Sequence, residues 1–260
     1  MNQKAAPVLD FDNVCLSFGG LRAIKNVTLR VGDRELVGLI GPNGAGKTTM
    51  FNLTTGVYAP DQGRIALNGE TISGLQPHVI NRRGISRTFQ NIRLWGDLTV
   101  IDNVRAALAR TAAIPLWQSV MRTGRSTQSE RELTEKAHAL LEYFDLVRVE
   151  DEKARNLPYG EQRRLEIARA LATEPALLLL DEPAAGMNTG EKTHLMELIQ
   201  RLQHDRHISV LLIEHDMKVV MGICERVAVL DYGEKIAEGR PEEIQKDPRV
   251  IEAYLGTPAQ

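Results

Sequence analysis

Gly41-Pro42-Asn43-Gly44-Ala45-Gly46-Lys47-Thr48 is the stretch that decides the fold of this chain. It fits the pattern G-x-x-x-x-G-K-[ST], in which a glycine-rich turn leads from a buried strand into a helix. The apolar segment from Glu35 to Ile40 precedes the turn, and a helix is predicted from about Lys47. Backbone N–H groups of such a turn surround phosphate oxygens, and the helix N-terminus adds a partial positive charge. The sequence therefore predicts a phosphate-binding loop in an α/β fold.

Side chains of this loop and of a second strand supply the chemistry that phosphates require. Lys47 is predicted to reach the β and γ phosphates of a nucleotide as a point charge, and the Thr48 hydroxyl to ligate Mg²⁺. The run Leu177 to Leu180 predicts a buried strand that ends at Asp181, whose carboxylate would hold Mg²⁺ through a water molecule. Glu182 projects past the strand end, where it is placed to polarise a water molecule that attacks the γ phosphate.

The composition of the 260 residues is typical of a globular protein. Apolar residues make up 43% and charged residues 25%, and 32 Lys and Arg against 34 Asp and Glu give a net charge of -2. These values exclude a disordered chain, a collagen-like repeat and a strongly basic nucleic-acid binder. Cys15 and Cys224 are the only cysteines, which favours a reducing compartment and buried apolar roles. No apolar run approaches the ~18 residues of a membrane span, and Asp10 and Asp12 fall where a signal peptide would be apolar, so we expect a cytosolic location.

Strand and helix patterns alternate at both ends of the chain, and the middle is helical. Helices are predicted at Gly160–Thr173 and Thr189–Gln203, a long loop from Thr111 to Gln128, and a helix after the capping box of Ser129 and Glu132. The predicted strands are Val8–Ser17, Val27–Val31, Glu35–Ile40, Arg64–Leu67, Leu177–Asp181, Ser209–Ile213, Arg226–Tyr232 and Glu234–Glu238. We therefore expect one α/β core that is interrupted by a helical insertion at about residues 91–160.

A phosphate loop with an acidic pair occurs in several classes of nucleotide hydrolase. A GTPase is disfavoured because the guanine-selecting string N-K-x-D is missing from the sequence. A kinase, a recombinase and a transporter motor all remain open on these two features. The residues between and beyond them distinguish these classes.

Over essentially its full length, the chain resembles the nucleotide-binding subunits of ATP-binding-cassette (ABC) transporters. Phe18 lies 23 residues before Gly41, where that family has an aromatic residue that stacks on adenine. Gln90, in Arg87-Thr-Phe-Gln-Asn91, is similar to the glutamine of the Q-loop. The other similar segments are the signature helix (Leu157-Pro-Tyr-Gly-Glu-Gln-Arg-Arg-Leu-Glu-Ile-Ala-Arg169), the D-loop (Gly186-Met187-Asn188) and the switch histidine (His215).

The resemblance implies both a fold and a site. The fold would be a single P-loop ATPase domain over residues 1–260, with a RecA-like core, an antiparallel β subdomain and a helical subdomain. ATP would be held by Phe18 and by the loop from Gly41 to Thr49, and Mg²⁺ by Thr48, Gln90 and Asp181. The residues implied in catalysis are Lys47, Gln90, Glu182 and His215, of which the histidine would contact the γ phosphate and the glutamine would sense a membrane partner.

Departures from the family's usual Leu-Ser-Gly-Gly-Gln signature predict an asymmetric pair of cassettes. In that family two cassettes pair head to tail, and each ATP lies between the phosphate loop of one chain and the signature of the other. Here Pro158 replaces the serine, Tyr159 the first glycine and Glu161 the glutamine, Gly160 is kept, and Asn188 stands where the D-loop usually has an aspartate. Proline has neither a hydroxyl nor an N–H to donate, and tyrosine adds bulk where close approach is needed. We therefore expect a heterodimer with a different cassette that carries a standard signature.

Within the family, the chain is most similar to the ATP-binding subunits of branched-chain amino-acid importers. The similar strings are Tyr159 to Arg169, Asp181-Glu-Pro-Ala-Ala-Gly-Met-Asn188, Ile213-Glu-His-Asp-Met-Lys-Val-Val-Met-Gly222 and Arg87-Thr-Phe-Gln-Asn-Ile-Arg-Leu94. This resemblance implies uptake of branched-chain amino acids with a second, different cassette, two integral-membrane permeases and a periplasmic or extracellular substrate-binding protein. The chain would lie at the cytoplasmic face of the inner (cell) membrane as a peripheral subunit, with a permease loop docked near Trp95.

Two alternative functions are weighed against amino-acid import. A related ABC system, for urea or amide import or for lipopolysaccharide export, would use the same chemistry with other permeases. A soluble cassette ATPase that acts on DNA or ribosomes is less favoured, because such proteins commonly carry two cassettes or a long coiled-coil insertion. The near-neutral charge also lacks the electrostatic signature of nucleic-acid binding, so no nucleic-acid partner is expected.

Overall fold

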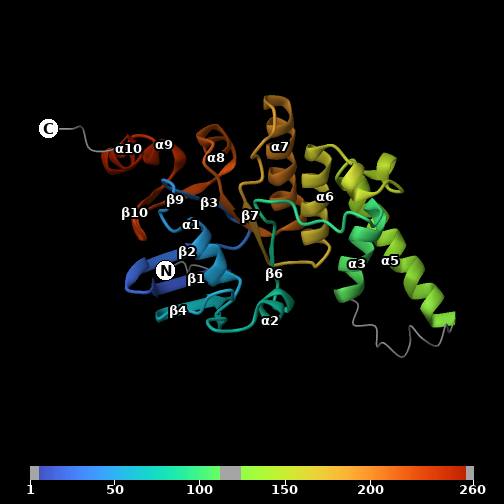
Figure 1. Cartoon of the computed structure of the whole chain (residues 1–260), viewed down its shortest axis with the longest axis horizontal. Helices are drawn as coiled ribbons and strands as arrows, with labels where there is room; N and C mark the ends of the chain where they lie inside the picture. The colour runs from blue at the N-terminus through green and yellow to red at the C-terminus, as the bar shows by residue number, and fades with distance from the viewer. Residues whose placement is uncertain (1–5, 112–123, 256–260) are drawn as a thin grey trace, which may run out of the picture. The chain divides into compact units, whose positions relative to one another are not determined.

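The computed structural model describes residues 6–111 and 124–255, and the chain divides into two compact units (Figure 1). The first unit comprises Met1–Arg87 and Ala176–Gln260, and the second comprises Thr88–Pro175. The second unit extends beyond the predicted insertion of residues 91–160 at both ends, and at its carboxyl end it includes the helix that follows Pro158. Within the described ranges, no helix is both long and apolar enough to cross a membrane.

A six-stranded sheet forms the centre of the first unit, with strand order β10-β9-β3-β8-β7-β6. Five of its strands run parallel, and β10 pairs antiparallel with β9 at one edge. Every residue of β3, β7 and β8 is buried, as expected of strands whose two faces are both covered. The strands are β3 (Leu36–Ile40), β6 (Ile85–Arg87), β7 (Leu177–Asp181), β8 (Ser209–Ile213), β9 (Arg226–Asp231) and β10 (Glu234–Gly239). Since parallel strands end at the same edge of a sheet, the loops after β3, β7 and β8 emerge together.

A second sheet in this unit is antiparallel, with order β2-β1-β4-β5. Its strands are β1 (Leu9–Phe18), β2 (Leu21–Val31), β4 (Gln62–Leu67) and β5 (Glu70–Thr71). The predicted start of β2 at Val27 is wrong by six residues. Gly19 and Gly20, with φ of +51° and +89°, form a two-residue turn that pairs Phe18 with Leu21. Two glycines with positive φ are a strong hairpin signal, so the sequence contained this information.

The helices of the first unit accompany these sheets. They are α1 (Lys47–Thr54), α2 (Pro77–Arg82), α7 (Thr189–Arg206), α8 (Met217–Ile223), α9 (Pro241–Ile244) and α10 (Pro248–Leu255). One apolar cluster takes side chains from both sheets and from α1, among them Phe11, Ile24, Phe51 and Leu179. Because α1 is part of this core, the phosphate loop that leads into it is anchored at its helical end.

The second unit is helical, as the sequence predicts. Its elements are α3 (Val100–Thr111), α5 (Gly124–Tyr143), α6 (Tyr159–Leu171) and the short 3₁₀ helices η1 (Val147–Val149) and η2 (Ala154–Asn156). Helix α3 packs against both α5 and α6, which lie beside it in Figure 1. The loop prediction is wrong for Thr111 and for residues 124–128, which are helical, while residues 112–123 lie outside the described part. The capping box at Ser129 falls inside α5, because a few Ser and Thr residues cost a helix only tenths of a kcal/mol each.

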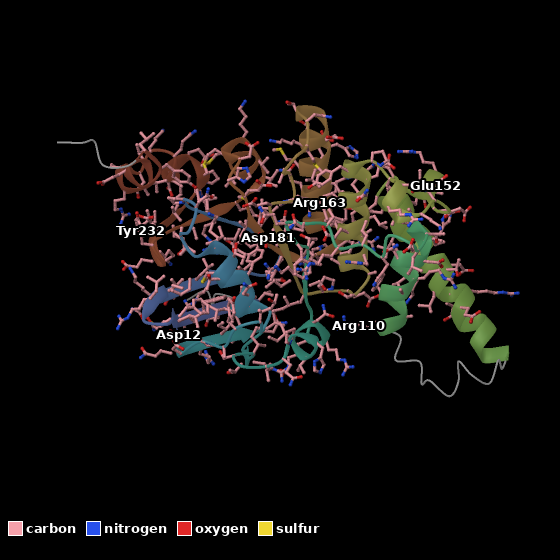
Figure 2. The ribbon with its side chains drawn as sticks, viewed as in Figure 1. Asp12, Arg110, Glu152, Arg163, Asp181 and Tyr232 are labelled. Carbon is pink, nitrogen blue, oxygen red and sulfur yellow. The ribbon has the colours of Figure 1, made fainter. Side chains whose placement is uncertain are left out.

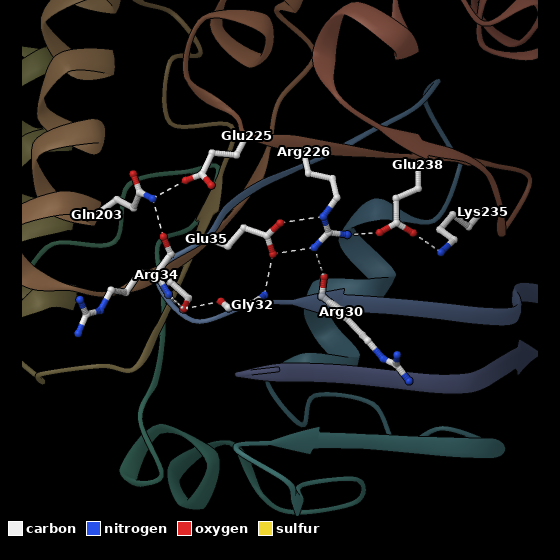
Figure 3. A network of polar contacts seen from close by, with 10 residues as sticks. Arg30, Gly32, Arg34, Glu35, Gln203, Glu225, Arg226, Lys235 and Glu238 are labelled. Carbon is white, nitrogen blue, oxygen red and sulfur yellow. Dashed lines mark hydrogen bonds and ion pairs between the residues drawn. The ribbon is translucent and has the colours of Figure 1, made fainter. Parts of the chain in front are cut away.

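A polar network ties the amino-terminal ends of β3 and β9 together (Figure 3). Arg226 donates to both carboxylate oxygens of Glu35 at 2.7 Å and also pairs with Glu238, and the N–H of Gly32 donates to Glu35 at 2.7 Å. Burial would raise the pKa of the Glu35 carboxyl, but the hydrogen bonds from Arg226 and Gly32 and the arginine charge outweigh it and hold this pKa below its usual value of 4.5. The folded state therefore favours the ionised carboxylate.

This lowered pKa predicts an acid-sensitive contribution to stability. The contribution is fully present above the unfolded pKa near 4.5 and is lost as the pH falls through the lower folded pKa. Glu35→Gln is expected to lower the free energy of unfolding at pH 7 by about 1–2 kcal/mol and to flatten its pH dependence below pH 4.5. Denaturant titrations from pH 7 to pH 3 measure both effects. Asp33→Asn is the control, since Asp33 and its partner Arg34 are exposed and should contribute under about 0.5 kcal/mol; equal slopes for the two variants would contradict the assignment.

Candidate active site

The glycine-rich loop from Gly41 to Gly46 lies between β3 and α1, as predicted, and Lys47 and Thr48 begin α1. Three of its glycines have positive φ, at +148° for Gly41, +81° for Gly44 and +106° for Gly46. The carbonyl of Ala45 accepts a hydrogen bond of 3.0 Å from the N–H of Gly233, in the turn between β9 and β10. The turn between β9 and β10 thus holds the phosphate loop on one side. The sequence pattern does not predict this contact.

Gly41→Ala is expected to lower the free energy of unfolding by at least about 2 kcal/mol. A Cβ at Gly41 would lie 2.0 Å from the carbonyl oxygen of Leu230, a backbone atom that cannot give way cheaply. The matched control is Gly44→Ala, where φ is also positive but no atom lies within 4 Å of the added Cβ. Gly44→Ala should lower the free energy of unfolding by only about 1 kcal/mol, because backbone strain alone opposes the substitution. Urea unfolding of both variants measures the difference, and equal losses would contradict the steric argument.

Lys47 is buried and folds back onto the start of its own loop. Its ammonium group donates to the carbonyl oxygens of Gly41 at 2.7 Å and Pro42 at 2.9 Å. Burial lowers the pKa of this amine, and the negative charges of Glu182 and Asp181 oppose the shift. The side chains of Asn43 and Thr48 are exposed at the same loop, so a phosphate group can reach the Thr48 hydroxyl.

Asp181 ends β7 as a buried carboxylate. Arg87, at the end of the neighbouring β6, pairs with it at 2.7 Å and also donates to the Asn52 side chain of α1 at 2.7 Å. The guanidinium of Arg87 lies 5.4 Å from the centre of the Phe51 ring. Arg87 therefore connects the predicted Mg²⁺ ligand to the helix that follows the phosphate loop. The position of Arg87 next to the Q-loop string does not indicate this role, because its partner Asp181 is 94 positions away in the sequence.

The structure brings Glu182 and His215 together. Glu182 adopts a left-handed backbone conformation with φ of +46°, and its N–H donates to the carbonyl of Ile213 at 2.9 Å. The Nδ1 atom of His215 lies 3.5 Å from Oε2 of Glu182, and 59% of the histidine side chain is exposed. A carboxylate next to an imidazole at the end of buried strands is an arrangement suited to proton transfer. The sequence motifs alone did not establish this contact.

Glu214, between Ile213 and His215, is a second site residue that the sequence motifs do not indicate. Its side chain is fully buried and accepts hydrogen bonds from the N–H groups of Ala184 at 2.8 Å and His215 at 3.2 Å. Burial raises the pKa of this carboxyl, and the N–H donors oppose the increase. A charged residue directly after the apolar strand Ser209–Ile213 was the available signal.

The D-loop segment Gly186-Met187-Asn188 leads into α7. Asn188 is the N-cap of α7: its side chain accepts from the N–H of Glu191 at 3.0 Å, and its own N–H donates to the Glu191 carboxylate at 2.9 Å. Asparagine and aspartate are equally good N-caps. The replacement of the family's aspartate by Asn188 therefore preserves the start of this helix.

Two aromatic residues of the first unit also bear on the site. Phe18, at the end of β1, is 43% exposed and makes an edge contact with Tyr58 at a centroid distance of 5.0 Å. An exposed ring face is consistent with stacking on a base. Burial raises the pKa of the Tyr254 phenol in α10, and the nearby N–H of Gly41 opposes the increase. No local pattern in the sequence indicates that this helix approaches the phosphate loop.

Of the two cysteines, only Cys224 has the buried position expected of both. Cys224 is buried and Cys15 half-buried, and neither forms a disulfide. Burial raises the pKa of the Cys224 thiol to about 12, so this thiol stays protonated at neutral pH.

Gln90 and the signature residues belong to the second unit, where a buried arginine connects their segments. Arg163 of α6, labelled in Figure 2, is fully buried. It donates to the carbonyls of Phe89 at 2.6 Å and Gln90 at 2.7 Å, and to the Glu166 carboxylate at 2.7 Å. Glu166 in turn accepts from the N–H groups of Phe89 at 3.3 Å and Arg93 at 3.2 Å. The backbone of the Q-loop is therefore bound to the signature helix inside this unit.

The signature residues are held by contacts within the same unit. Pro158 is the N-cap of α6, and the hydroxyl of Tyr159 accepts from Arg163 at 3.0 Å. The buried carboxylate of Glu161 forms ion pairs with Arg148 and Arg164. Its charge is thus already compensated by two arginines of the same unit.

Comparison with known proteins decides the family. Residues 24–185 match the sequence model of the family described as "ABC transporter". The chain belongs to the ABC transporter family. Residues 234–260 also match the family described as "Branched-chain amino acid ATP-binding cassette transporter". As a member of the ABC transporter family, the chain is an ATP-binding, ATP-hydrolysing subunit.

Curated ABC relatives align along nearly the whole chain. The high-affinity branched-chain amino acid transport ATP-binding protein BraF of Pseudomonas aeruginosa is 46% identical over 250 residues, which cover 96% of this chain and 98% of that protein. The protein of the same description from Escherichia coli K12, LivG, is 45% identical over the same shares. The lipopolysaccharide export system ATP-binding protein LptB of Haemophilus influenzae is 36% identical over 96% of this chain and 97% of that protein.

Solved structures agree with the family assignment. The ADP conformation of MJ1267, an ATP-binding cassette of an ABC transporter, has a TM-score of 0.84 at 31% identity and covers 97% of this chain and 100% of that chain. A dimeric post-hydrolysis state of the ATP-binding cassette MJ0796, bound to ADP and phosphate, has a TM-score of 0.75 at 26% identity, over 90% and 98% of the two chains. The predicted P-loop ATPase fold with an antiparallel β subdomain is confirmed.

Proposed function

We propose that this chain is the ATPase subunit of an importer of branched-chain amino acids, and that it acts at the cytoplasmic face of the cell membrane. The observation that carries the proposal is the 46% identity to BraF over 96% of the chain, together with the match of residues 234–260 to the branched-chain amino acid family. Lipopolysaccharide export has weaker support, since the LptB relative is 36% identical. Both functions would use the same ATP chemistry.

In this proposal the phosphate loop binds ATP. The backbone N–H groups from Gly44 to Thr49 would surround the phosphate oxygens at the start of α1. The ammonium group of Lys47 would exchange the carbonyls of Gly41 and Pro42 for the β and γ phosphates, which carry full negative charge. Phe18 would stack on the adenine through its exposed face.

A magnesium ion fits the donor set that the sequence predicts. The Thr48 hydroxyl and the Asp181 carboxylate, both in the first unit, are hard oxygen ligands, the type that Mg²⁺ prefers. Asp181 is buried and fixed by Arg87, so its carboxylate is held in one orientation. When bound, the ion would neutralise negative charge that develops on the β and γ phosphates.

Glu182 is the general base of the proposed hydrolysis. Its carboxylate would take a proton from water as the water oxygen bonds to the γ phosphorus. The bond from that phosphorus to the oxygen that bridges it to the β phosphate breaks, and ADP and inorganic phosphate result. His215, 3.5 Å from Glu182, would orient this carboxylate and donate to a γ phosphate oxygen.

The signature geometry supports pairing with a different cassette. Pro158 has no N–H, the hydroxyl of Tyr159 already accepts from Arg163, and Glu161 is paired with Arg148 and Arg164. Pro158 therefore lacks both the hydroxyl and the N–H of the serine that it replaces, and Tyr159 is bulkier than the glycine that it replaces, so this signature would contact the ATP of the partner poorly. We therefore propose that the more active hydrolytic site lies between the phosphate loop of this chain and the standard signature of another cassette. We also propose that residues 1–260 form one nucleotide-binding domain.

Size-exclusion chromatography tests this asymmetry. Glu182→Gln slows hydrolysis and so traps any ATP-bound dimer, but this chain alone should stay monomeric in ATP, because its own signature completes a site poorly. Addition of the second cassette of the same transporter should produce a dimer peak. A robust ATP-dependent homodimer of the Glu182→Gln chain would contradict the heterodimer.

An affinity pull-down tests the proposed partners. Wild-type chain is captured from mildly detergent-solubilised membranes, and the co-purifying proteins are identified by mass spectrometry. Two different multi-spanning permeases and a second cassette are expected. We propose that the permeases dock at the surface that includes the half-exposed side chains of Trp95 and Leu98. Recovery of the chain alone, or with ribosomes or DNA, would contradict the transport function and leave the ATPase chemistry in place.

A further inference from the structure

A buried carboxylate joins the two loops that carry Glu182 and His215. Glu214 has 0% of its surface exposed. Its Oε1 atom accepts from the N–H of Ala184 at 2.8 Å, and its Oε2 atom accepts from the N–H of His215 at 3.2 Å. The nearby N–H of Asp216 also lowers the pKa of this carboxyl. One side chain after β8 thus binds the loop after β7 as well as its own loop.

The donors on Glu214 are close in sequence to the reacting groups. Ala184 is two residues after Glu182, in a turn that the Ala185 N–H closes on the carbonyl of Glu182 at 3.2 Å. His215 is the next residue after Glu214 itself. A shift of the Ala184 amide would therefore move the turn that aims the Glu182 carboxylate, and a shift of the His215 amide would move the imidazole.

Other ties between the two loops leave room for such a shift. The N–H of Glu182 donates to the carbonyl of Ile213 at 2.9 Å, which fixes the strand ends but not the turn beyond them. Lys192 and Asp216 pair at 2.6 Å at a partly exposed position on α7 and before α8. The Glu214 carboxylate is fully removed from water, where hydrogen bonds to a charged group are strongest.

The chemistry of a carboxylate suits this position. Two carboxylate oxygens offer only acceptor sites, so they satisfy several N–H donors at once, whereas a glutamine amide must place its NH₂ group against one of them. Burial raises the pKa of Glu214, which means that the fold holds this carboxyl at a cost in solvation. A side chain needed only to fill space would not carry that cost.

We propose that Glu214 is a positioning residue for ATP hydrolysis, which fixes the Glu182 loop against the His215 loop through the Ala184 and His215 amides. The inference rests on the proposed function, because it assigns the two loops to one hydrolytic step. It does not place Glu214 in contact with ATP.

Hydrogen exchange of the isolated chain tests the contact without reference to activity. In Glu214→Gln, the amides of Ala184 and His215 should exchange about 10-fold faster or more, whereas amides of β3 should be unchanged. Glu35→Gln is the matched control, since it removes a carboxylate of similar chemistry from the opposite ends of these strands. It should leave the Ala184 and His215 amides at their wild-type rates. Unchanged exchange of both amides in Glu214→Gln would overturn the proposal.

Kinetics of the transporter in membranes tests the catalytic consequence. Glu214→Gln should lower the kcat for ATP by about 10- to 100-fold, because small misplacements of reacting groups have effects of that size, while the affinity for ATP changes less than twofold. Glu35→Gln should lower thermal stability and leave kcat unchanged. A wild-type kcat in Glu214→Gln, or a loss that only follows the folded fraction, would overturn the positioning role. If wild-type membranes show no ATPase activity, the proposed function fails, and the exchange result still decides whether Glu214 holds the loops.

Discussion

Glu182→Gln is expected to lower the rate of ATP hydrolysis by about 10²- to 10³-fold while ATP binding stays within about twofold of wild type. Glutamine has nearly the shape of glutamate but cannot accept a proton from water at neutral pH, and general-base catalysis contributes about 10²–10⁴-fold. The N–H of Glu182 still donates to the carbonyl of Ile213, because only the side chain changes. The loop should therefore keep its conformation, and the variant should separate chemistry from binding.

Steady-state phosphate release and nucleotide binding of the assembled transporter measure this prediction. Glu197→Gln is the matched control, because Glu197 is exposed on α7 and lies outside the proposed site. It should retain wild-type kcat and ATP affinity. If Glu182→Gln hydrolyses ATP at a rate within a few-fold of wild type, then Glu182 is not the general base. The proposed role of His215, 3.5 Å away, in orienting that carboxylate would then also be wrong.

Arg163→Met is expected to lower the free energy of unfolding by about 3–5 kcal/mol. The substitution leaves the Glu166 carboxylate buried without its positive partner, which is the costly case for a buried ion pair. The carbonyls of Phe89 and Gln90 lose their donor as well. A methionine fills much of the arginine volume, so the loss reports charge and hydrogen bonding more than a cavity.

A double variant distinguishes the loss of the ion pair between Arg163 and Glu166 from a general loss of core packing. Arg163→Met combined with Glu166→Met removes both charges and should recover at least about 1 kcal/mol of the loss, because no uncompensated buried charge remains. Urea unfolding at pH 7 measures the two single variants, Arg163→Met and Glu166→Met, and the double variant. Where Arg163→Met alone fails to fold, a double variant that does fold shows the same coupling. Additive losses in the double variant would contradict a coupled buried pair.

The sequence predicts those parts of the site that depend on local pattern. The glycine-rich turn, the apolar strand before it and the strand Leu177–Asp181 each carry their signal within ten residues, and the structure confirms their bounds closely. The strand at Ser209–Ile213 is likewise confirmed to the residue. Short buried strands of a parallel sheet have a strong and continuous apolar signal, so their ends are well defined.

Contacts between distant segments were not predictable in the same way. Arg87 and Asp181 are 94 positions apart, and their pairing follows from the order of β6 and β7 in the sheet. Glu214 contacts an amide 30 positions earlier, and Tyr254 of the last helix lies near the phosphate loop. Each depends on which strands become neighbours, a property that periodicity does not encode. The early start of α5 was missed for a different reason, since Ser and Thr near Ser129 suggest a helix cap although they also fit inside a helix.

Uptake of radiolabelled leucine tests the central claim most directly. Cells that lack this chain are supplied with the wild-type chain or with Glu182→Gln, and initial uptake rates are compared with those of an unrelated solute. The proposal predicts that the wild-type chain restores leucine uptake, that Glu182→Gln is produced at the same level and does not restore it, and that the unrelated solute is unaffected. Leucine uptake that is the same with the wild-type chain, with Glu182→Gln and with neither would contradict the claim that this ATPase drives branched-chain amino-acid import.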